Sequence, residues 1–244
     1  MQPLLTRIAR RFGYDVRKGP PLFEHYLNDA RATDAWVSQV SKLPVRTILD
    51  VGAFDGSTAL DFRRQFPVST IYAFEPSPST FSLLQQRARG DQLLHSIHSA
   101  VGERDGSTTL HEAVAPGANS LLPTAPTVGA YSPAELNREV RAVSVPITRL
   151  DTFCQREHLE RVDILKIDAQ GYERHILDGC GEWLSPSRIR GIVMELLFVS
   201  LYVGQTWAGE ALEHLRARGY RCFGIGGIAY DDINGWKWGD AWFL

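Results

Sequence analysis

The sequence predicts an α/β fold built on a parallel, doubly wound sheet, and two observations lead to this prediction. Short runs rich in Val, Ile and Leu alternate along the chain with longer amphipathic segments, which is the order expected when each strand is followed by a helix. The apolar runs lack polar alternation, as is typical of strands buried on both faces of a sheet. Right-handed crossovers between such strands place helices on both faces.

The elements are assigned in chain order. Residues 1–46 are expected to form a helical cap, because apolar residues recur at near-helical spacing up to Pro44. Residues 47–244 are expected to form one α/β domain. Its predicted strands are residues 47–51, 70–74, 93–101, 162–167 and 189–196, and its predicted helices are residues 58–66, 78–89, 150–159, 172–177 and 208–218.

Two regions depart from this alternation. A hairpin is expected at residues 107–112, followed by a long loop rich in Pro, Gly, Ala and Ser at residues 115–133. Loops of that length are usually functional, so this loop and the N-terminal helices are the expected lid over a site. From Tyr220 onward, glycines separate two aromatic-rich runs, which predicts a terminal hairpin that closes one edge of the sheet.

Composition excludes several classes of protein. The 244 residues include 26 Lys and Arg against 28 Asp and Glu, a net charge of -2, so nothing favours nucleic acid as a partner. No apolar run approaches the length of a membrane span, and the N-terminus resembles no secretory signal. Three widely spaced cysteines fit neither a disulfide framework nor a zinc site, so a cytoplasmic protein is expected.

The basic N-terminus suggests one alternative partner for the protein. Its cationic side chains offer a weak peripheral contact with an anionic membrane surface, although a solvated helix face is favoured. These residues are Arg7, Arg10, Arg11, Arg17 and Lys18.

The most informative segment is the one at residues 50–57, where a buried strand ends in Asp50 and a glycine turn precedes a helix. In doubly wound sheets such a turn binds nucleotide-like ligands, and Gly52 and Gly56 allow close backbone approach. Phe54 stands where the dinucleotide fingerprint has its second glycine, which disfavours NAD and FAD. Asp50 suits a ligand with a positively charged end, such as S-adenosylmethionine. The alternative is an ordinary turn in which Asp55 or Ser57 caps the helix.

Two further acids end predicted strands. Glu75 follows the second strand, 23 residues after Gly52, at the spacing where an acid meets ribose hydroxyls, and Pro76 stops the strand there. Asp168 ends a later strand and is expected in the same crevice as Asp50. The run Asp-Ala-Gln-Gly that starts at Asp168 differs from the Asn/Asp-Pro-Pro-aromatic run of enzymes that methylate base amino groups, so base N-methylation is disfavoured.

Several blocks of residues 48–179 together resemble one family. The blocks DVGAFDGSTALDF, FEPSPSTFSLL, SAVGERDGSTTL, NSL, VPITRLDTF and DILKIDAQGYERHILDG are similar, in order and spacing, to FkbM-type S-adenosylmethionine-dependent methyltransferases. The resemblance implies the Rossmann-like class I methyltransferase fold, with a seven-stranded, mostly parallel sheet and an antiparallel last strand. It also implies methylation of hydroxyl oxygens, often on sugars or natural products.

Site residues follow from the resemblance by position. The turn at the methionine end comprises Asp50, Gly52, Ala53, Phe54, Asp55, Gly56 and Ser57; Glu75 with Pro76 holds the ribose, Ala100 and Val101 lie near the adenine, and Asp168 lies beside the methyl group. The implied acceptor side comprises Asn119, Ser120, Gln170 and Tyr172. The sequence differs from the commoner family wording at Phe54, where Asn is frequent, and at Gln170, where Glu is frequent.

Methyl transfer from a sulfonium requires an acceptor oxygen held in line behind the methyl carbon, and a base to remove the hydroxyl proton. Asp168 is the first candidate for this base and Glu195 the second. If both acids converge, a divalent metal is an alternative aid, but no third ligand is evident and none is expected.

The predicted function is therefore an S-adenosylmethionine-dependent O-methyltransferase whose acceptor is a hydroxyl of a sugar, glycan or other polyhydroxylated metabolite. Two rivals stay open: a nicotinamide-dependent oxidoreductase on the same kind of sheet, and a non-catalytic protein that binds the cofactor or a glycan through the same cleft.

Overall fold

The computed structural model describes residues 33–231 and 233–244. Within the predicted N-terminal cap, residues 33–40 form a helix whose Trp36 and Val40 are buried. The indole N–H of Trp36 donates a hydrogen bond of 3.0 Å to the carbonyl of Phe243, so the end of the cap is fixed to the last strand. Residues 41–46 form turns and irregular chain rather than helix. Residues 1–32, which carry the basic side chains from Arg7 to Lys18, lie outside the described residues.

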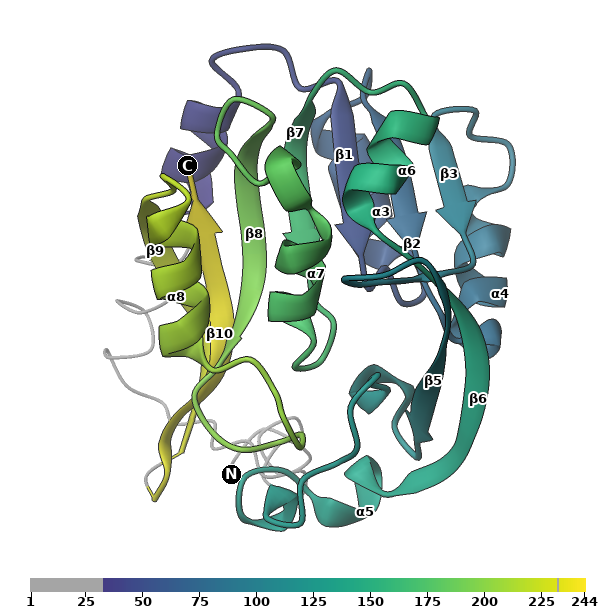
Figure 1. The fold of residues 1–244 in the computed structure, drawn as a ribbon, viewed down its shortest axis with the longest axis vertical. Helices are drawn as coiled ribbons and strands as arrows, with labels where there is room; N and C mark the ends of the chain where they lie inside the picture. Colours follow the sequence, from purple (N-terminus) through teal and green to yellow (C-terminus); the bar gives the residue numbers. More distant parts are fainter. Residues whose placement is uncertain (1–32, 232) are drawn as a thin grey trace, which may run out of the picture.

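The main sheet has seven strands in the order β3-β2-β1-β7-β8-β10-β9 (Figure 1). They are β1 (Thr47–Val51), β2 (Thr70–Phe74), β3 (Leu94–Ile97), β7 (Val162–Ile167), β8 (Ile189–Leu197), β9 (Cys222–Asp231) and β10 (Gly235–Phe243). The pairings from β3 through β8 are parallel, and β10 is antiparallel to both of its neighbours. The predicted parallel sheet with an antiparallel last strand and a terminal hairpin is confirmed.

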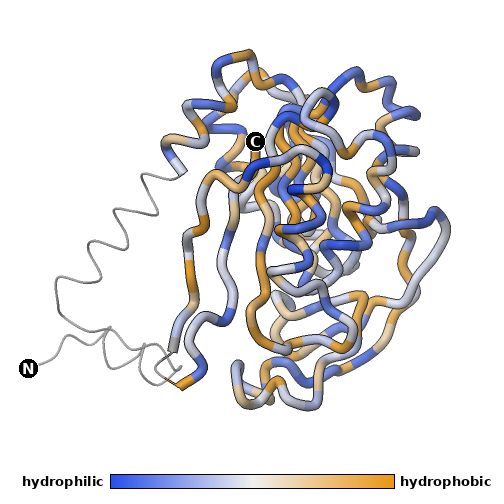
Figure 2. Tube along the Cα trace, turned by 60° about the vertical axis from the view of Figure 1, so that its left-hand side comes forward, coloured by the Kyte–Doolittle hydropathy of each residue, from blue (hydrophilic) through white to orange (hydrophobic). Residues whose placement is uncertain are grey.

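Helices cover both faces of this sheet. On the face toward the viewer in Figure 1 lie α6 (Leu150–Arg156), α7 (Glu173–Gly179) and α8 (Ala208–Ala217), and their apolar side chains pack with Leu49 and Leu165. On the other face, α3 (Ser57–Gln65), α4 (Pro78–Ala88) and the helix at residues 33–40 pack with Ile48 and Ile164. Adjacent residues of one strand enter different clusters because successive side chains point to opposite faces. Figure 2 accordingly shows hydrophobic residues concentrated along the central strands.

A second sheet of three strands, in the order β4-β6-β5, stands at the carboxyl end of the main sheet (Figure 1). It comprises β4 (Ala100–Val101), β5 (Gly106–Ala113) and β6 (Glu139–Thr148). The predicted hairpin at residues 107–112 is wrong, because these residues form one continuous strand that pairs with β6. The strand β6 itself was not predicted: most of its residues are exposed and it contains Pro146, which cannot donate to a ladder.

The single strand predicted at residues 93–101 is also corrected. The chain turns between β3 and β4, where the N–H of Ser99 donates to the carbonyl of Ile97, so β3 belongs to the main sheet and β4 to the second one. The long loop that follows β5 contains the short helical segments η1 (Pro116–Ala118), η2 (Val128–Ala130) and α5 (Ala134–Asn137). A further such segment, η3 (Gly181–Trp183), follows α7.

The turn after β1 is pressed against the end of β7. Gly52 has a φ of +73°, and a Cβ atom placed on it would lie 1.8 Å from the carbonyl oxygen of Asp168. Both the left-handed backbone and the missing side chain are therefore required here.

Gly52→Ala is expected to lower the free energy of unfolding by about 3 kcal/mol or more, because the new methyl group collides with backbone that cannot yield. Denaturant unfolding measures this change. Gly209→Ala is the matched control, because Gly209 has open space around its Cβ position and lies within α8, where alanine is the better helix former. Equal stability of the Gly52 variant and wild type would contradict the close approach of β1 and β7.

Candidate functional site

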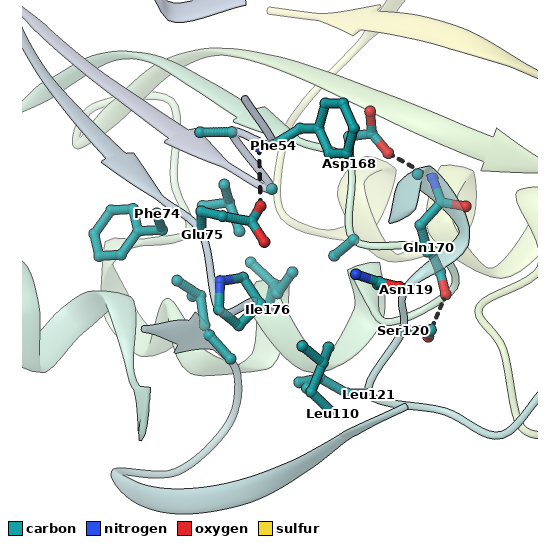
Figure 3. A pocket seen from close by; sticks show the side chains of 18 of the residues that line it. Phe54, Phe74, Glu75, Leu110, Asn119, Ser120, Leu121, Asp168, Gln170 and Ile176 are labelled. Atoms are coloured by element: carbon teal, nitrogen blue, oxygen red, sulfur yellow. Dashed lines mark hydrogen bonds between the residues drawn. The ribbon is translucent and has the colours of Figure 1, made fainter. Parts of the chain in front are cut away.

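A cavity of about 270 Å³ lies where β1, β2 and β7 end and the second sheet begins (Figure 3). Its lining comes from the glycine turn, the ends of β2 and β7, strand β4, and the loop after β5. Of the residues predicted from the sequence, the lining includes Gly52, Ala53, Phe54, Ser57, Glu75, Pro76, Ala100, Val101, Asn119, Ser120, Asp168 and Gln170. Segments far apart in the chain thus meet at the carboxyl edge of the sheet, where doubly wound folds bind ligands.

Glu75 points into this cavity (Figure 3) and is only 6% exposed. Its Oε1 accepts hydrogen bonds from the Ser77 N–H and the Thr80 hydroxyl. Its Oε2 accepts one, from the N–H of Phe54 at 2.9 Å. Because a carboxylate oxygen accepts about two hydrogen bonds, Oε2 has a site left for a ligand hydroxyl. Burial raises the pKa of Glu75, and the three donors act against that rise.

The side chain of Gln170 links two acids at the end of the sheet. Its amide nitrogen donates to Asp168 Oδ1 at 2.8 Å and to Glu195 Oε2 at 3.1 Å, and its amide oxygen accepts from the Tyr202 hydroxyl at 2.8 Å. Since an amide nitrogen has two hydrogens, both are used inside the protein. The residue lines the cavity as predicted, but its donors hold the acids in place rather than facing an acceptor.

The two predicted bases occupy different environments. Asp168 lines the cavity and its side chain is 40% exposed. Glu195 does not belong to the lining and lies on the other side of Gln170. Burial raises the pKa of Glu195 well above its ordinary value, and repulsion from Asp168, Glu173 and Asp240 adds to the rise. Of the two candidate bases, Asp168 is therefore the one whose side chain lines the cavity.

Glu173 is a third acid close to this group, and it is 1% exposed. Its Oε1 accepts from the N–H groups of Ala169 and Gly171, while its Oε2 is buried with no hydrogen-bond partner among the described residues. Burial raises its pKa from 4.5 to about 7. The folded protein therefore binds this proton more tightly than the unfolded chain does.

The sign of the resulting pH dependence follows from linkage. The stabilisation that the protonated Glu173 provides is complete below pH 4.5 and is lost as the pH rises to about 7. Relative to Glu173→Gln, the wild type is expected to lose about 3 kcal/mol of unfolding free energy over that interval. Denaturant unfolding at pH 4.5 and 7.5 measures the difference, with the exposed Glu160→Gln as control. A difference that does not change with pH would contradict the raised pKa.

Asp50 and Lys166 lie below the glycine turn. Asp50 is fully buried and outside the lining, so the predicted direct contact with a ligand is not what the structure presents. Its Oδ1 lies 3.3 Å from the Nζ atom of Lys166, a residue that does line the cavity. Burial raises the pKa of Asp50, whereas the ammonium group lowers it.

Three other predicted residues also lie outside the lining. Asp55 pairs with Arg87 at 2.6 Å and accepts from the N–H of Ser57, but the N-cap residue of α3 is Gly56 and no side chain caps the helix, so neither Asp55 nor Ser57 is the cap. Gly56 packs against α4, since a Cβ atom on it would lie 2.8 Å from Leu84. The Tyr172 hydroxyl donates to Glu103 at 2.9 Å, so this side chain supports the fold next to Gly102 rather than facing the cavity.

The loop after β5 forms the remaining wall. Asn119 Oδ1 accepts from the N–H of Ala113 at 2.8 Å, and its amide nitrogen points toward the cavity (Figure 3). The Ser120 hydroxyl donates to the carbonyl of Gln170 at 2.7 Å. This part of the expected lid is thus fastened to β5 on one side and to the end of β7 on the other.

The sequence analysis missed several lining residues, of which Lys166 is the most informative. Lys166 is a charged residue in a largely apolar strand, and it stands two positions before Asp168, so the two side chains are expected on the same face of the sheet. The sequence therefore contained a signal for Lys166. The apolar lining residues Phe74, Leu110, Leu121 and Ile176 had no such signal, because buried apolar residues are common throughout the chain.

Two structural features are absent from the described residues. In that part of the chain no three His, Cys, Asp or Glu side chains are grouped so as to hold a metal ion. None of the described helices has the length and apolar character to cross a membrane.

The sheet order, the reversed last strand and the cavity at the carboxyl edge together define the class I methyltransferase fold. Residues 50–222 match the model of the methyltransferase FkbM domain, which is more than half of the chain. The chain therefore belongs to the FkbM methyltransferase family, and the resemblance seen in the sequence is confirmed.

Curated relatives agree with this membership. The chain is 33% identical over 165 residues to Methyltransferase 1 of Beauveria bassiana, covering 61% of this chain and 64% of that protein. It is 27% identical to the 2-O-methyltransferase NoeI of Sinorhizobium fredii, covering 66% and 68%. It is also 27% identical to the 31-O-demethyl-FK506 methyltransferase FkbM of Streptomyces tacrolimicus, covering 72% and 73%. The match thus spans just under two thirds of the first of these relatives.

Proposed function

We propose that the protein is an S-adenosylmethionine-dependent O-methyltransferase whose acceptor is a hydroxyl of a sugar, glycan or other polyhydroxylated small molecule. Family membership supports methyl transfer. Two relatives whose names specify transfer to oxygen, NoeI and FkbM, support a hydroxyl acceptor. All three cysteines are free thiols, which supports the cytoplasm as the compartment in which the protein works.

One observation carries the proposal: Glu75 and Asp168 line a single cavity with the glycine turn between them. The chemistry of the lining residues can be compared with that of S-adenosylmethionine, group by group. The open site on Glu75 Oε2 accepts from a ribose hydroxyl, the apolar wall of Ala100 and Val101 suits an adenine, and the carboxylate of Asp168 suits a cationic sulfonium. These residues fit the group.

When bound, S-adenosylmethionine supplies a methyl group activated by its positive sulfur. The protein then has to hold an acceptor hydroxyl and take its proton. Asp168 has the position for that proton transfer, because its Oδ1 is held by Gln170 while its exposed side faces the cavity. The amide nitrogen of Asn119 is directed at the same space and is a candidate donor to the acceptor.

The oxidoreductase rival is disfavoured by the turn itself. Phe54 adopts a φ of +51°, and its side chain stands in the cavity lining where a dinucleotide site has a glycine against the pyrophosphate. The second rival, a non-catalytic binding protein, shares the cofactor contacts and differs only in turnover.

The first experiment is a parallel calorimetric titration with S-adenosylmethionine, S-adenosylhomocysteine and NADPH. Micromolar binding of the first two alone is expected, and binding of NADPH alone would replace the proposal with the oxidoreductase. Transfer of a labelled methyl group to a panel of sugars and polyols follows, with and without EDTA. Transfer to a hydroxyl that persists in EDTA is the expected result, whereas cofactor binding without transfer across the panel would favour the non-catalytic rival.

A further inference from the structure

We infer that Lys166 is a positioning residue that ties the glycine turn after β1 to Asp168 after β7, and that Asp50 acts on the site only through Lys166. The inference rests on the proposed function for its ligand, but its geometry is independent of it. It replaces the direct contact between Asp50 and the cofactor that the sequence predicts.

The contacts of the ammonium group define the tie. Lys166 Nζ donates to the carbonyl of Gly52 at 2.9 Å, lies 3.3 Å from Asp50 Oδ1 and lies 3.6 Å from Asp168 Oδ2. Its side chain is 11% exposed. One cation therefore contacts the turn, the strand end and the buried acid below them.

The register of the sheet explains why these groups meet. Asp50 of β1 lies directly opposite Lys166 of β7, and Asp168 follows Lys166 by two positions, so all three side chains project from the same face. The backbone of Asp168 also touches Gly52, where a Cβ atom would overlap its carbonyl oxygen. The ammonium group thus lies where the turn after β1 and the end of β7 are in van der Waals contact.

The ion pair with Lys166 is the polar contact that the described residues provide for the Asp50 carboxylate. Asp50 is 0% exposed, and its two oxygens accept no hydrogen bond among the described residues. The group that offsets the cost of burying its charge is Lys166. Removing one partner of a buried ion pair leaves the other without compensation, so the two residues should behave as a unit.

The tie has a consequence for Asp168. Gln170 holds its Oδ1 at 2.8 Å, and Lys166 stands 3.6 Å from its Oδ2. These two contacts restrict the orientation of the Asp168 carboxylate, because one oxygen faces the Gln170 amide and the other faces the Lys166 ammonium group. Without the ammonium group, both the shape of the turn and the orientation of Asp168 lose a constraint.

A double-mutant cycle tests the inference, with the variants Asp50→Asn, Lys166→Met and the pair together. Methionine keeps the apolar stem of lysine and removes its charge. Lys42→Met, at an exposed position, is the matched control. Calorimetry gives the dissociation constant for S-adenosylmethionine, steady-state kinetics separate kcat from KM, and denaturant unfolding reports the stability of each variant.

Lys166→Met is expected to weaken cofactor binding and to lower kcat by about tenfold or more each. Adding Asp50→Asn to it should change cofactor affinity by less than about twofold and should raise stability above that of Lys166→Met alone, since no unpaired buried charge is left. Single effects that multiply in the double variant would overturn the inference, because Asp50 would then act on the cofactor directly. Unchanged affinity and kcat in Lys166→Met would overturn it as well.

Failure of the inference differs from failure of the proposed function. If wild type binds no S-adenosylmethionine, the proposed function fails, while the stability arm of the cycle still measures the coupling of Asp50 with Lys166. Additive stability effects in that arm would reject the pairing on which the inference stands.

Discussion

Asp168→Asn is expected to lower kcat by about 10² to 10⁴ fold while the dissociation constant for S-adenosylmethionine changes by less than about tenfold. Asparagine preserves the size of the side chain and an oxygen that accepts from Gln170. It removes the carboxylate that we propose takes the hydroxyl proton. Calorimetry and methyl-transfer kinetics on the same preparation separate the two quantities.

Asp61→Asn is the matched control for this variant, because Asp61 is a surface acid with 71% of its side chain exposed and pairs with Arg64 one helical turn away. Glu195→Gln separates the two candidate bases. If Glu195→Gln abolishes turnover while Asp168→Asn retains it, the base is Glu195 and the role proposed for Asp168 is wrong.

Glu75→Gln is expected to weaken S-adenosylmethionine binding by about 100-fold. The carboxylate accepts three hydrogen bonds from the protein and has one open acceptor site, whereas an amide turns one of its two oxygens into a donor. That donor faces either the N–H of Phe54 or the pair of donors at Ser77 and Thr80. The variant is therefore expected to lose both the proposed ribose contact and the order of the surrounding turn.

Two measurements keep the role of Glu75 separate from folding. Thermal unfolding of Glu75→Gln is compared with that of the exposed surface variant Glu213→Gln, whose carboxylate pairs with Arg216. Binding of S-adenosylhomocysteine is compared with that of its 2′-deoxy analogue. Wild type should prefer the ribose compound and the Glu75 variant should not; a preference that survives the substitution would place the ribose elsewhere.

Much of the fold was predictable because its signals are local. The bounds of β1, β2 and β7 agree with the prediction, since each is a run of apolar residues bordered by polar or turn residues and buried on both faces. The second sheet was not predictable in the same way. Strand β6 is mostly exposed, and its pairing with β5 joins residues that lie 26 to 41 positions apart in the chain, so neither burial nor local turn chemistry marks it.

The side chains of the cavity show the same difference between what local sequence signals predict and what depends on distant parts of the chain. Acids at strand ends and glycines in the turn are visible in a sequence, and Gly52, Glu75 and Asp168 all line the cavity. Which neighbouring side chain reaches a ligand depends on register and burial. Asp50 lies below the turn, Glu195 lies beyond Gln170, and Tyr172 bonds to Glu103, although the sequence placed all three at the site.

The sequence by itself determined the alternation of strands and helices, the position of the glycine turn, and the family, because these depend on residue type and spacing along the chain. Only the tertiary structure decided that Lys166 stands between Asp50 and the cavity, and that Gln170 uses its amide on Asp168 and Glu195. The physical reason is that charge compensation and hydrogen bonding are satisfied between strands that are adjacent in space. A residue's neighbour across the sheet is set by register, which no single segment contains.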